Sequence, residues 1–370
     1  MIEILRPGGA DARLTELRAA GVVEQDMWPL AAEELRELDA LEHVDPAIAP
    51  PEYIDLDDPT DIEAHTRYIY FPWRSTLVRM PAADVFYRLK TSRNRYLLTG
   101  VEQASWGAAR VGVAGLSVGS AALTSCALTG ARSFHLADPD ILAPTNLNRI
   151  AGSVCDVGVA KLTLAARSLL ESDPYTKLTL FPDGYHASNA EEFLGAPAQQ
   201  LSVIIEEIDD VARKIDMRRR ARVAGIPVVS ATDMGDNVVI DVERYDLDAD
   251  YPIFHGRGEH FDERDAAHPR QKLQMAASIV GDTLTSKMAF STAQLGRSIS
   301  SWPQLGSTAA VAGAVVAVVA RGIVCGRDIV SGRYVIDIES LIYGAGEAQG
   351  WNELSADQIG TFLAALGRAG

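Results

Sequence analysis

Cysteine is scarce in this 370-residue chain, which contains only Cys126, Cys155 and Cys325. Three scattered cysteines supply neither a disulfide framework nor a CxxC pair, so we expect no disulfide scaffold and no structural zinc site. We expect Cys126 and Cys325 to be buried and Cys155 to be exposed in a loop. Whether Cys155 is reactive is left open by the sequence.

Basic charge is also in short supply, because 34 Lys and Arg face 50 Asp and Glu, for a net charge of −16. A nucleic-acid-binding protein needs a basic surface, so this class is excluded. The longest apolar run, residues 309–320, is shorter than the roughly 20 residues of a membrane span. The amino terminus has no apolar segment typical of a secretory signal. We therefore expect a cytoplasmic protein with no membrane partner.

The charge is unevenly distributed along the chain. Residues 1–70 hold 17 acidic and 5 basic side chains, whereas residues 71–110 hold 7 basic and 2 acidic ones. A Pro-rich connector at residues 45–52 follows amphipathic helical sequence at residues 30–41. We predict three parts: an acidic accessory domain that could recruit substrate (1–85), a main domain (86–345) and a helical carboxyl-terminal segment (346–370).

Alternating strand and helix patterns begin at residue 110 and predict an α/β fold. Such alternation is typical of a Rossmann-like, doubly wound and mostly parallel sheet. We expect strands at residues 110–114, 133–137, 177–181, 202–205, 226–230, 236–245 and 333–339, and helices at 120–129, 158–170, 210–224, 306–325 (buried) and 357–366, the last opened by a capping box at 355–358.

A glycine turn, Gly115-Leu-Ser-Val-Gly119-Ser120, joins the first of these strands to the first helix. It is a degraded GxGxxG and would expose main-chain N–H groups at a helix amino terminus. With Asp138 at the end of the second strand, it is compatible with an NAD(P)-dependent oxidoreductase. The same residues also spell GxSxG, the nucleophile elbow of hydrolases, with Ser117 as nucleophile.

The hydrolase alternative needs a downstream acid and base, for example Asp210 followed by His255 or His260. The elbow normally follows several strands and an oxyanion segment, and both are absent before Ser117. We expect His255, His260 and His268 to be solvent-exposed loop residues without metal-ligand spacing.

Three motifs after the second strand decide between these alternatives. They are D-P-D at residues 138–140, T-N-L-N-R at 145–149 and G-V-A-K at 158–161. In this order and at this spacing, they resemble the ThiF, MoeB and HesA superfamily of ubiquitin-activating-enzyme-like adenylyltransferases. The resemblance extends over about residues 90–245, with a weaker continuation toward 345. MoeB-like members often carry a zinc site, which the missing CxxC pairs exclude here.

The resemblance implies an ATP site on the Rossmann-like sheet. Arg149 and Lys161 would neutralise charge that develops on the phosphates during transfer of the adenylyl group. Asp138 would accept hydrogen bonds from the ribose hydroxyls, and Asn146 would contact the phosphates. The amides of the glycine turn would contribute the positive end of a helix dipole. The remaining cofactor-binding candidates are Gly115, Ser117, Gly119, Asp140, Asn148, Arg93 and Lys214.

A second acidic motif follows the strand at residues 202–205. Asp209 matches the position that the family associates with Mg²⁺, Asp210 replaces the family's Asn, and Lys214 matches a later basic residue. Carboxylates at the end of a strand suit a hard cation bridging ATP phosphates. The alternative is that the four acidic residues of this segment solvate a helix amino terminus and favour its dipole.

The basic segment contains Arg93-Asn94-Arg95-Tyr96, which is similar to the family's R-Y-x-R-Q segment. That segment sends an arginine into the ATP site of the partner protomer, which implies a homodimer. The residue order differs, so Arg93 and Arg95 are both candidates for this role. The alternative is a surface helix with scattered cations.

Taken together, these features predict an ATP-dependent adenylyltransferase that converts a carboxylate to an acyl-adenylate and releases pyrophosphate. The substrate would be the carboxyl terminus of a small carrier protein or a peptide, with Arg149, Lys161, Asp209 and Arg95 as the catalytic candidates. The alternatives are the NAD(P)-dependent oxidoreductase and a non-catalytic nucleotide-binding scaffold. No cysteine occupies a clear thioester position, so the acyl acceptor and the pathway are left open.

Overall fold

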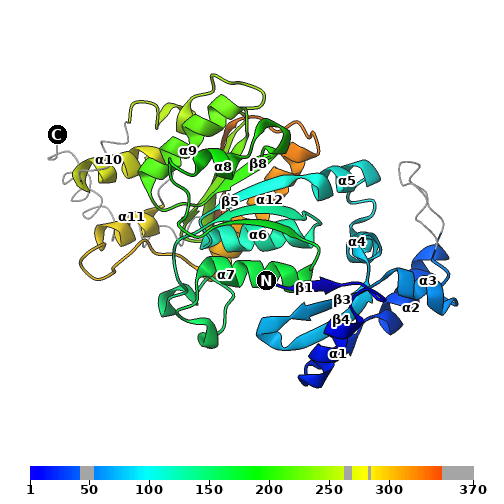
Figure 1. Ribbon diagram of the computed structural model, residues 1–370. Helices are drawn as coiled ribbons and strands as arrows, with labels where there is room; N and C mark the ends of the chain where they lie inside the picture. The colour runs from blue at the N-terminus through cyan, green and yellow to red at the C-terminus, as the bar shows by residue number, and fades with distance from the viewer. Residues whose placement is uncertain (42–53, 262–268, 282–284, 344–370) are drawn as a thin grey trace. The chain divides into compact units, whose positions relative to one another are not determined.

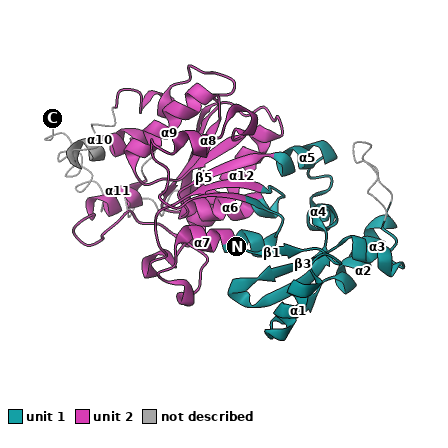
Figure 2. Cartoon of the chain, viewed as in Figure 1, with its two compact units in different colours: residues 1–108, 127–132, 167–177 teal, residues 109–126, 133–166, 178–370 magenta. Residues whose placement is uncertain are grey.

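The computed structural model describes residues 1–41, 54–261, 269–281 and 285–343 (Figure 1). Within it the chain divides into two compact units, coloured separately in Figure 2. Unit 1 comprises residues 1–108, 127–132 and 167–177, and unit 2 comprises residues 109–126, 133–166 and 178–370. The predicted Pro-rich connector and the predicted helix at 357–366 lie outside the described residues.

Unit 1 contains a four-stranded sheet that the sequence analysis did not predict. Its order is β1-β3-β4-β2, and β2 pairs with β4 in parallel while the other two pairs are antiparallel. The strands are short, and all four residues of β2 are exposed, so the period-2 signal in the sequence is weak. Their bounds are Glu3–Leu5 (β1), Val23–Asp26 (β2), Thr66–Phe71 (β3) and Thr76–Pro81 (β4).

The helices of unit 1 pack their apolar residues into small clusters. Trp28 and Leu35 of α2 are buried together with Val85 of α4. Leu14 and Leu17 of α1 contact Leu77 of β4. The helix bounds are Asp11–Ala19 (α1), Trp28–Asp39 (α2), Pro59–Ala64 (α3), Ala83–Thr91 (α4) and Gly100–Ala108 (α5).

Unit 2 is built on a seven-stranded sheet with the order β11-β10-β9-β8-β5-β6-β7. The central pairs β9–β8, β8–β5 and β5–β6 are parallel, whereas β10 and β11 join antiparallel at one edge. The strands are Arg110–Ala114 (β5), Ser133–Ala137 (β6), Lys177–Phe181 (β7), Val203–Glu206 (β8), Val228–Met234 (β9), Asn237–Glu243 (β10) and Gly332–Ile336 (β11). The predicted Rossmann-like, mostly parallel α/β fold is confirmed.

Helices cover both faces of this sheet (Figure 1). Helix α6 (Val118–Leu128) and helix α12 (Gly306–Val324) share one face, because a Cβ on Gly313 of α12 would lie only 2.5 Å from Ala121 of α6. Helices α8 (Ala190–Leu194) and α9 (Val211–Ala224) pack on the other face. The remaining helices are Lys161–Ser172 (α7), Pro269–Val280 (α10) and Ser286–Ala293 (α11).

Helix α12 is, among the described residues, the one helix long and apolar enough to cross a membrane by length and composition. It contacts β8, β9 and β10, and Ala312, Val316 and Ala320 are fully buried. A core helix of a sheet passes the same test, so this is weak evidence for membrane insertion. The predicted buried helix at 306–325 is confirmed.

The three cysteines follow the predicted pattern in two cases. Cys126 is buried in α6, and Cys155 is exposed. Cys325 is half-buried where α12 ends, so the prediction that it is buried was wrong.

Candidate nucleotide site

The glycine turn lies between β5 and α6, at the carboxyl end of the parallel strands. Gly115 has φ of +89°, and a Cβ there would lie 2.3 Å from the carbonyl oxygen of Glu207. Only glycine combines a left-handed backbone with this close approach to the chain after β8. The turn is therefore held against the end of the neighbouring strand, where ligands of open α/β sheets bind.

Asp138 follows β6 and holds the turn through main-chain hydrogen bonds. Its Oδ2 accepts from the Leu116 N–H at 2.6 Å, and its Oδ1 accepts from the Asp140 N–H at 2.8 Å. Burial raises the pKa of this carboxyl, and the two main-chain donors oppose that rise. Asp138 thus organises the predicted site, while its predicted contact with a ribose stays a prediction.

Arg149 is attached directly to the glycine turn. Its Nε donates to Ser117 Oγ at 2.8 Å, and its Nη1 donates to Asn148 Oδ1 at 3.0 Å and to the Thr145 carbonyl at 3.1 Å. Within the described residues, no hydrogen bond is formed by its Nη2. The structure therefore brings together a cation and a helix amino terminus, as an anion site requires.

Lys161 begins α7 and is buried, and its Nζ donates to Asp140 Oδ2 at 2.8 Å. The predicted candidates Lys161 and Asp140 are therefore partners in an ion pair. Asn146 has a local role, because its Oδ1 accepts from the Ala143 N–H at 2.9 Å and closes the turn before Arg149. Asn148 Nδ2 donates to the carbonyl of Gln304 at 2.8 Å.

The segment after β8 separates its acidic residues into different environments. Asp209 is exposed, as a ligand for Mg²⁺ held mainly by ATP phosphates would be. Asp210 is the N-cap of α9, because its Oδ1 accepts from the Arg213 N–H at 3.1 Å. Lys214 donates to both carboxylate oxygens of Glu206, at 3.1 and 3.2 Å. Its predicted role as a cofactor ligand would require it to leave this carboxylate.

The same segment does not simply solvate a helix start, which was the alternative interpretation. Glu206 is fully buried. Glu207 is half-buried, and its Oε1 accepts from the Ala231 N–H at 2.8 Å. Burial raises the pKa of Glu207 well above its ordinary value, and the neighbouring carboxylates of Glu206 and Asp233 raise it further, while Lys214 opposes the shift.

Arg93 and Arg95 belong to unit 1, whereas the other predicted site residues belong to unit 2. Arg93 is exposed in a 3₁₀ turn, Ser92–Asn94, and Arg95 lines a hollow of about 350 Å³ together with Tyr87 and Gln103. The chain turns sharply at Tyr96, which has φ of +68° and is exposed.

The hydrolase alternative is contradicted by the placement of its residues. The hydroxyl of Ser117 accepts from Arg149, and Asp210 caps α9. His255 Nε2 lies 2.9 Å from Asp241 Oδ1, and its Nδ1 lies 2.9 Å from the Tyr251 hydroxyl. The prediction that His255 is solvent-exposed was therefore wrong; His260 is exposed as predicted, and His268 lies outside the described residues.

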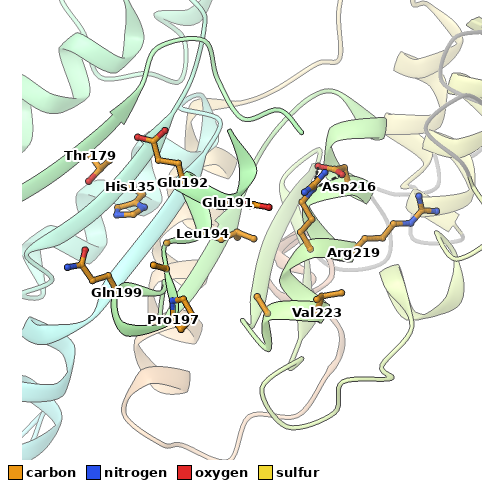
Figure 3. A pocket seen from close by; sticks show the side chains of 14 residues that line it. His135, Thr179, Glu191, Glu192, Leu194, Pro197, Gln199, Asp216, Arg219 and Val223 are labelled. Carbon is orange, nitrogen blue, oxygen red and sulfur yellow. Dashed lines mark hydrogen bonds and ion pairs between the residues drawn. The ribbon is translucent and has the colours of Figure 1, made fainter. Parts of the chain in front are cut away.

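A larger hollow of about 1070 Å³ lies elsewhere in unit 2, and none of the predicted site residues lines it. Figure 3 shows its two walls, with His135, Glu192 and Gln199 on one side and Asp216, Arg219 and Val223 on the other. Most of its lining comes from α8, α9 and the loop before β8. It is thus separate from the glycine turn at the carboxyl ends of the strands.

Two residues near the glycine turn were missed by the sequence analysis. Asp233 lies in β9, four residues after Val229, which pairs with β8. Gln304 precedes α12. The strand was predicted to end at Ser230, so Asp233 was not seen as a residue at the carboxyl end of a strand. Asp233 is separated from the apolar run at residues 226–229 by Ser230, Ala231 and Thr232, so its local signal was weak. Gln304 had no local signal.

Comparison with known proteins gives a family match over more than half of the chain. The model of the ThiF family matches residues 91–341. An uncharacterized protein of Mycobacterium tuberculosis (strain CDC 1551 / Oshkosh), MT1398, is 35% identical over 289 residues, which are 77% of this chain and 40% of that protein. The chain thus spans about two fifths of the length of this relative.

Two solved structures are also similar to the chain. The crystal structure of PaaA has 17% sequence identity and a TM-score of 0.49, covering 69% of this chain and 77% of that one. The crystal structure of the E. coli tRNA N6-threonylcarbamoyladenosine dehydratase TcdA has 18% identity and a TM-score of 0.47, covering 65% of this chain and 96% of that one.

Proposed function

The chain belongs to the ThiF family, and from this premise we propose that it is an adenylyltransferase that uses ATP to activate a carboxylate. A carboxylate oxygen attacks the α-phosphorus of ATP, the bond from that phosphorus to the bridging oxygen breaks, and pyrophosphate leaves. The products are an acyl-adenylate and pyrophosphate. The alternative NAD(P)-linked function would have no need of the cations grouped beside the glycine turn.

One observation carries the proposal: the guanidinium of Arg149 donates a hydrogen bond to Ser117 Oγ in the glycine turn. Negative charge builds on the α-phosphate and on the departing pyrophosphate, and a preorganised cation stabilises it without reorganising during the reaction. Arg149 is held by three protein oxygens, and its remaining donors can bind phosphate. Lys161 would add a second charge once a phosphate competes with Asp140 for its ammonium group.

Magnesium would be held by the ATP phosphates and by Asp209. The described residues contain no group of three or more side chains that could form a protein-only metal centre. Mg²⁺ commonly keeps several waters and takes one or two carboxylates beside substrate phosphates, so one exposed carboxylate fits this mode. The bound ion would neutralise phosphate charge.

Pyrophosphate exchange tests the reaction. The purified chain is incubated with Mg·ATP, labelled pyrophosphate and synthetic peptides that carry a free α-carboxyl group, with the same peptides as carboxyl-terminal amides for controls. We expect label to enter ATP only with the free acids. Stabilisation of the fold by NADH but not by Mg·ATP would contradict the proposal.

The substrate and the assembly are finer parts of the proposal. We expect the carboxyl terminus of a small carrier protein or of a peptide as substrate, and a homodimer in which Arg95 or Arg93 reaches the ATP site of the partner. Mixing Arg149→Ala chains with Arg95→Ala or Arg93→Ala chains tests this. Exchange activity should return in the mixture if the residues act in trans, and its failure to return with either variant would contradict the arrangement.

A further inference from the structure

Asp233 is a buried carboxylate at the edge of the proposed ATP site. It lies in β9 and is 4% exposed. Its Oδ2 accepts a hydrogen bond from Gln304 Nε2 at 3.1 Å. Within the part of the chain that the structure describes, its Oδ1 is buried and has no hydrogen-bond partner. An acceptor left in this state is unfavourable for folding, so its presence calls for another explanation than packing.

A continuous series of hydrogen bonds connects Asp233 to the glycine turn. The side chain of Gln304 is fixed by Asp233, and its main-chain carbonyl accepts from Asn148 Nδ2 at 2.8 Å. Asn148 Oδ1 accepts from Arg149 Nη1 at 3.0 Å. Arg149 in turn donates to Ser117. The orientation of the guanidinium therefore depends on residues from four separate segments.

Close packing fixes the same segment independently. A Cβ on Gly306 would lie 2.3 Å from the carbonyl oxygen of Asn148, so the chain before α12 touches the Arg149 loop directly. Two residues later, Thr308 Oγ1 donates to the carbonyl of Gly235 at 2.6 Å, in the turn between β9 and β10. The residues from Gln304 to Thr308 are thus held between the end of β9 and the Arg149 loop.

We infer that Asp233 is a positioning residue, which holds Arg149 in its ATP-binding orientation through Gln304 and Asn148. The inference rests on the proposed function, because it requires Arg149 to bind the phosphates. Asp233 acts on the ligand only through Arg149. In a purely packing role, the position could equally hold an apolar side chain of similar size, with no unpartnered oxygen.

Electrostatics agree with this placement. Burial raises the pKa of Asp233 to about 6, while Gln304 and the charge of Arg149 oppose the rise. Two charged side chains interact electrostatically with Asp233. They are Arg149, in the loop after β6, and Glu207, in the segment after β8. The charge of Arg149 therefore acts on Asp233, but the inferred positioning runs through the hydrogen bond to Gln304, which an uncharged acceptor can also make.

The test compares an acceptor-removing with an acceptor-retaining substitution. The affinity for Mg·ATP is measured by calorimetry in the full chain, with thermal unfolding of each variant as a check of the fold. Asp233→Asn keeps a side-chain oxygen for Gln304, so we expect its Kd within about twofold of the wild type. Asp233→Leu removes the acceptor, and we expect a Kd about tenfold higher, as for loss of one hydrogen bond of about 1.4 kcal/mol.

Gln304→Leu breaks the same connection from the other side. We expect a similar increase in Kd, and the double variant Asp233→Leu/Gln304→Leu should bind no more weakly than either single variant, because both remove one link. Gln199→Leu, an exposed glutamine in the loop before β8, is the matched control and should bind as the wild type does. If Asp233→Leu does not fold, Gln304→Leu decides the question alone.

The possible failures are distinguishable. Wild-type affinity in Gln304→Leu and Asp233→Leu, with weak binding in Arg149→Ala, would overturn the inference and leave the proposed function intact. Equal loss of affinity in Asp233→Asn and Asp233→Leu would overturn it too, since the retained oxygen would then have no effect. Absence of Mg·ATP binding by the wild-type chain would contradict the proposed function and the inference together.

Discussion

Buried carboxylates at two places on the central sheet of unit 2 differ in how many of their oxygens accept hydrogen bonds. In the first, which we call the buried ion cluster, Arg218 lies between Glu206 and Glu243, and all three side chains are fully buried. In the second, Asp233 has one hydrogen bond and one unpartnered oxygen. The first cluster ties α9 to β8 and β10, whereas the second adjoins the proposed ATP site.

Every carboxylate in the buried ion cluster has several donors. Arg218 Nη1 lies 2.5 Å from Glu206, its Nε lies 2.6 Å from Glu243, and its Nη2 donates to Ser230 Oγ at 2.9 Å. Glu243 Oε1 also accepts from the Phe254 N–H and the Tyr245 hydroxyl. Burial alone would raise the pKa of Glu206, but the charges of Lys214 and Arg218 outweigh it and hold the pKa low.

The difference shows how burial is used in the two places. A buried carboxylate that accepts hydrogen bonds from several donors suits a rigid scaffold. Removal of one partner would leave the remaining charges buried without compensation, so the cluster resists rearrangement. A carboxylate with an unpartnered oxygen weakens the fold where it lies. The carboxylate with the unpartnered oxygen, Asp233, lies at the edge of the proposed ligand site, and the buried ion cluster lies among structural elements.

The largest effect is expected from breaking the buried ion cluster. Arg218→Ala leaves Glu206 and Glu243 buried without their main cation, so we expect a loss of about 3–5 kcal/mol in the free energy of unfolding. Urea denaturation measures it. Arg220→Ala on the same helix is the control, since its pair with Asp216 is partly exposed, and we expect a loss below about 1 kcal/mol. A loss below 1 kcal/mol in Arg218→Ala would contradict the scaffold role.

The next effect concerns ligand affinity. Arg149→Ala removes the guanidinium beside the glycine turn, and we expect the Kd for Mg·ATP to rise about 10- to 100-fold, because charge-assisted hydrogen bonds contribute about 1.5–3 kcal/mol. Calorimetric titration measures the change, again with Arg220→Ala as the matched control. Unchanged affinity in Arg149→Ala would show that this arginine does not bind the triphosphate.

The pH dependence of the free energy of unfolding tests the cost of burying Asp233. The pKa of Asp233 is about 6 in the folded chain and about 3.9 in the unfolded chain, so the carboxyl is neutral in both states below pH 4 and charged in both above pH 6. Its burial therefore destabilises the fold only as the pH rises. We expect Asp233→Asn to gain on the order of 2 kcal/mol over the wild type at pH 8 and to lose this gain between pH 6 and pH 4.

Denaturation of both chains at pH 4, 6 and 8 measures this gain. Asp246→Asn is a suitable control, because Asp246 is paired with Arg244 and partly exposed, and it should gain no stability at pH 8. A gain in Asp233→Asn that is the same at pH 4 and pH 8 would contradict the electrostatic explanation.

The smallest effect distinguishes two adjacent acidic residues. Asp210→Ala removes the N-cap of α9 and should lower the free energy of unfolding by about 1 kcal/mol. Asp209→Ala, one residue earlier and exposed, should change it by less than about 0.5 kcal/mol but should weaken the Mg²⁺ dependence of ATP binding. Equal stability losses in the two variants would contradict the assignment of Asp210 as the cap.

Local sequence patterns predicted the central sheet well. The strands β5, β6 and β7 have the predicted bounds, and α9 begins one residue later than predicted. These elements are marked by apolar runs, glycine turns and a capping residue, all of which act over a few residues. The sheet of unit 1 escaped prediction because its short strands are stabilised by pairing between distant segments.

Part of the candidate site was beyond local patterns for the same reason. Gln304 is 71 residues from Asp233, and nothing in its own neighbourhood indicates a contact with β9. His255 was predicted to be exposed, but Asp241 pairs with both His255 and Arg333, which lies 92 residues from Asp241. Motifs therefore named Arg149, Lys161 and the glycine turn as candidates, whereas the contacts of Arg149 with Ser117 and of Asn148 with Gln304 required the structure.

The most direct test of the account is a crystal structure with a non-hydrolysable ATP analogue and Mg²⁺. We predict its phosphates within hydrogen-bond distance of Arg149 and of the main-chain amides between Leu116 and Ser120. An analogue bound instead in the hollow lined by His135 and Arg219, with the glycine turn empty, would contradict the account.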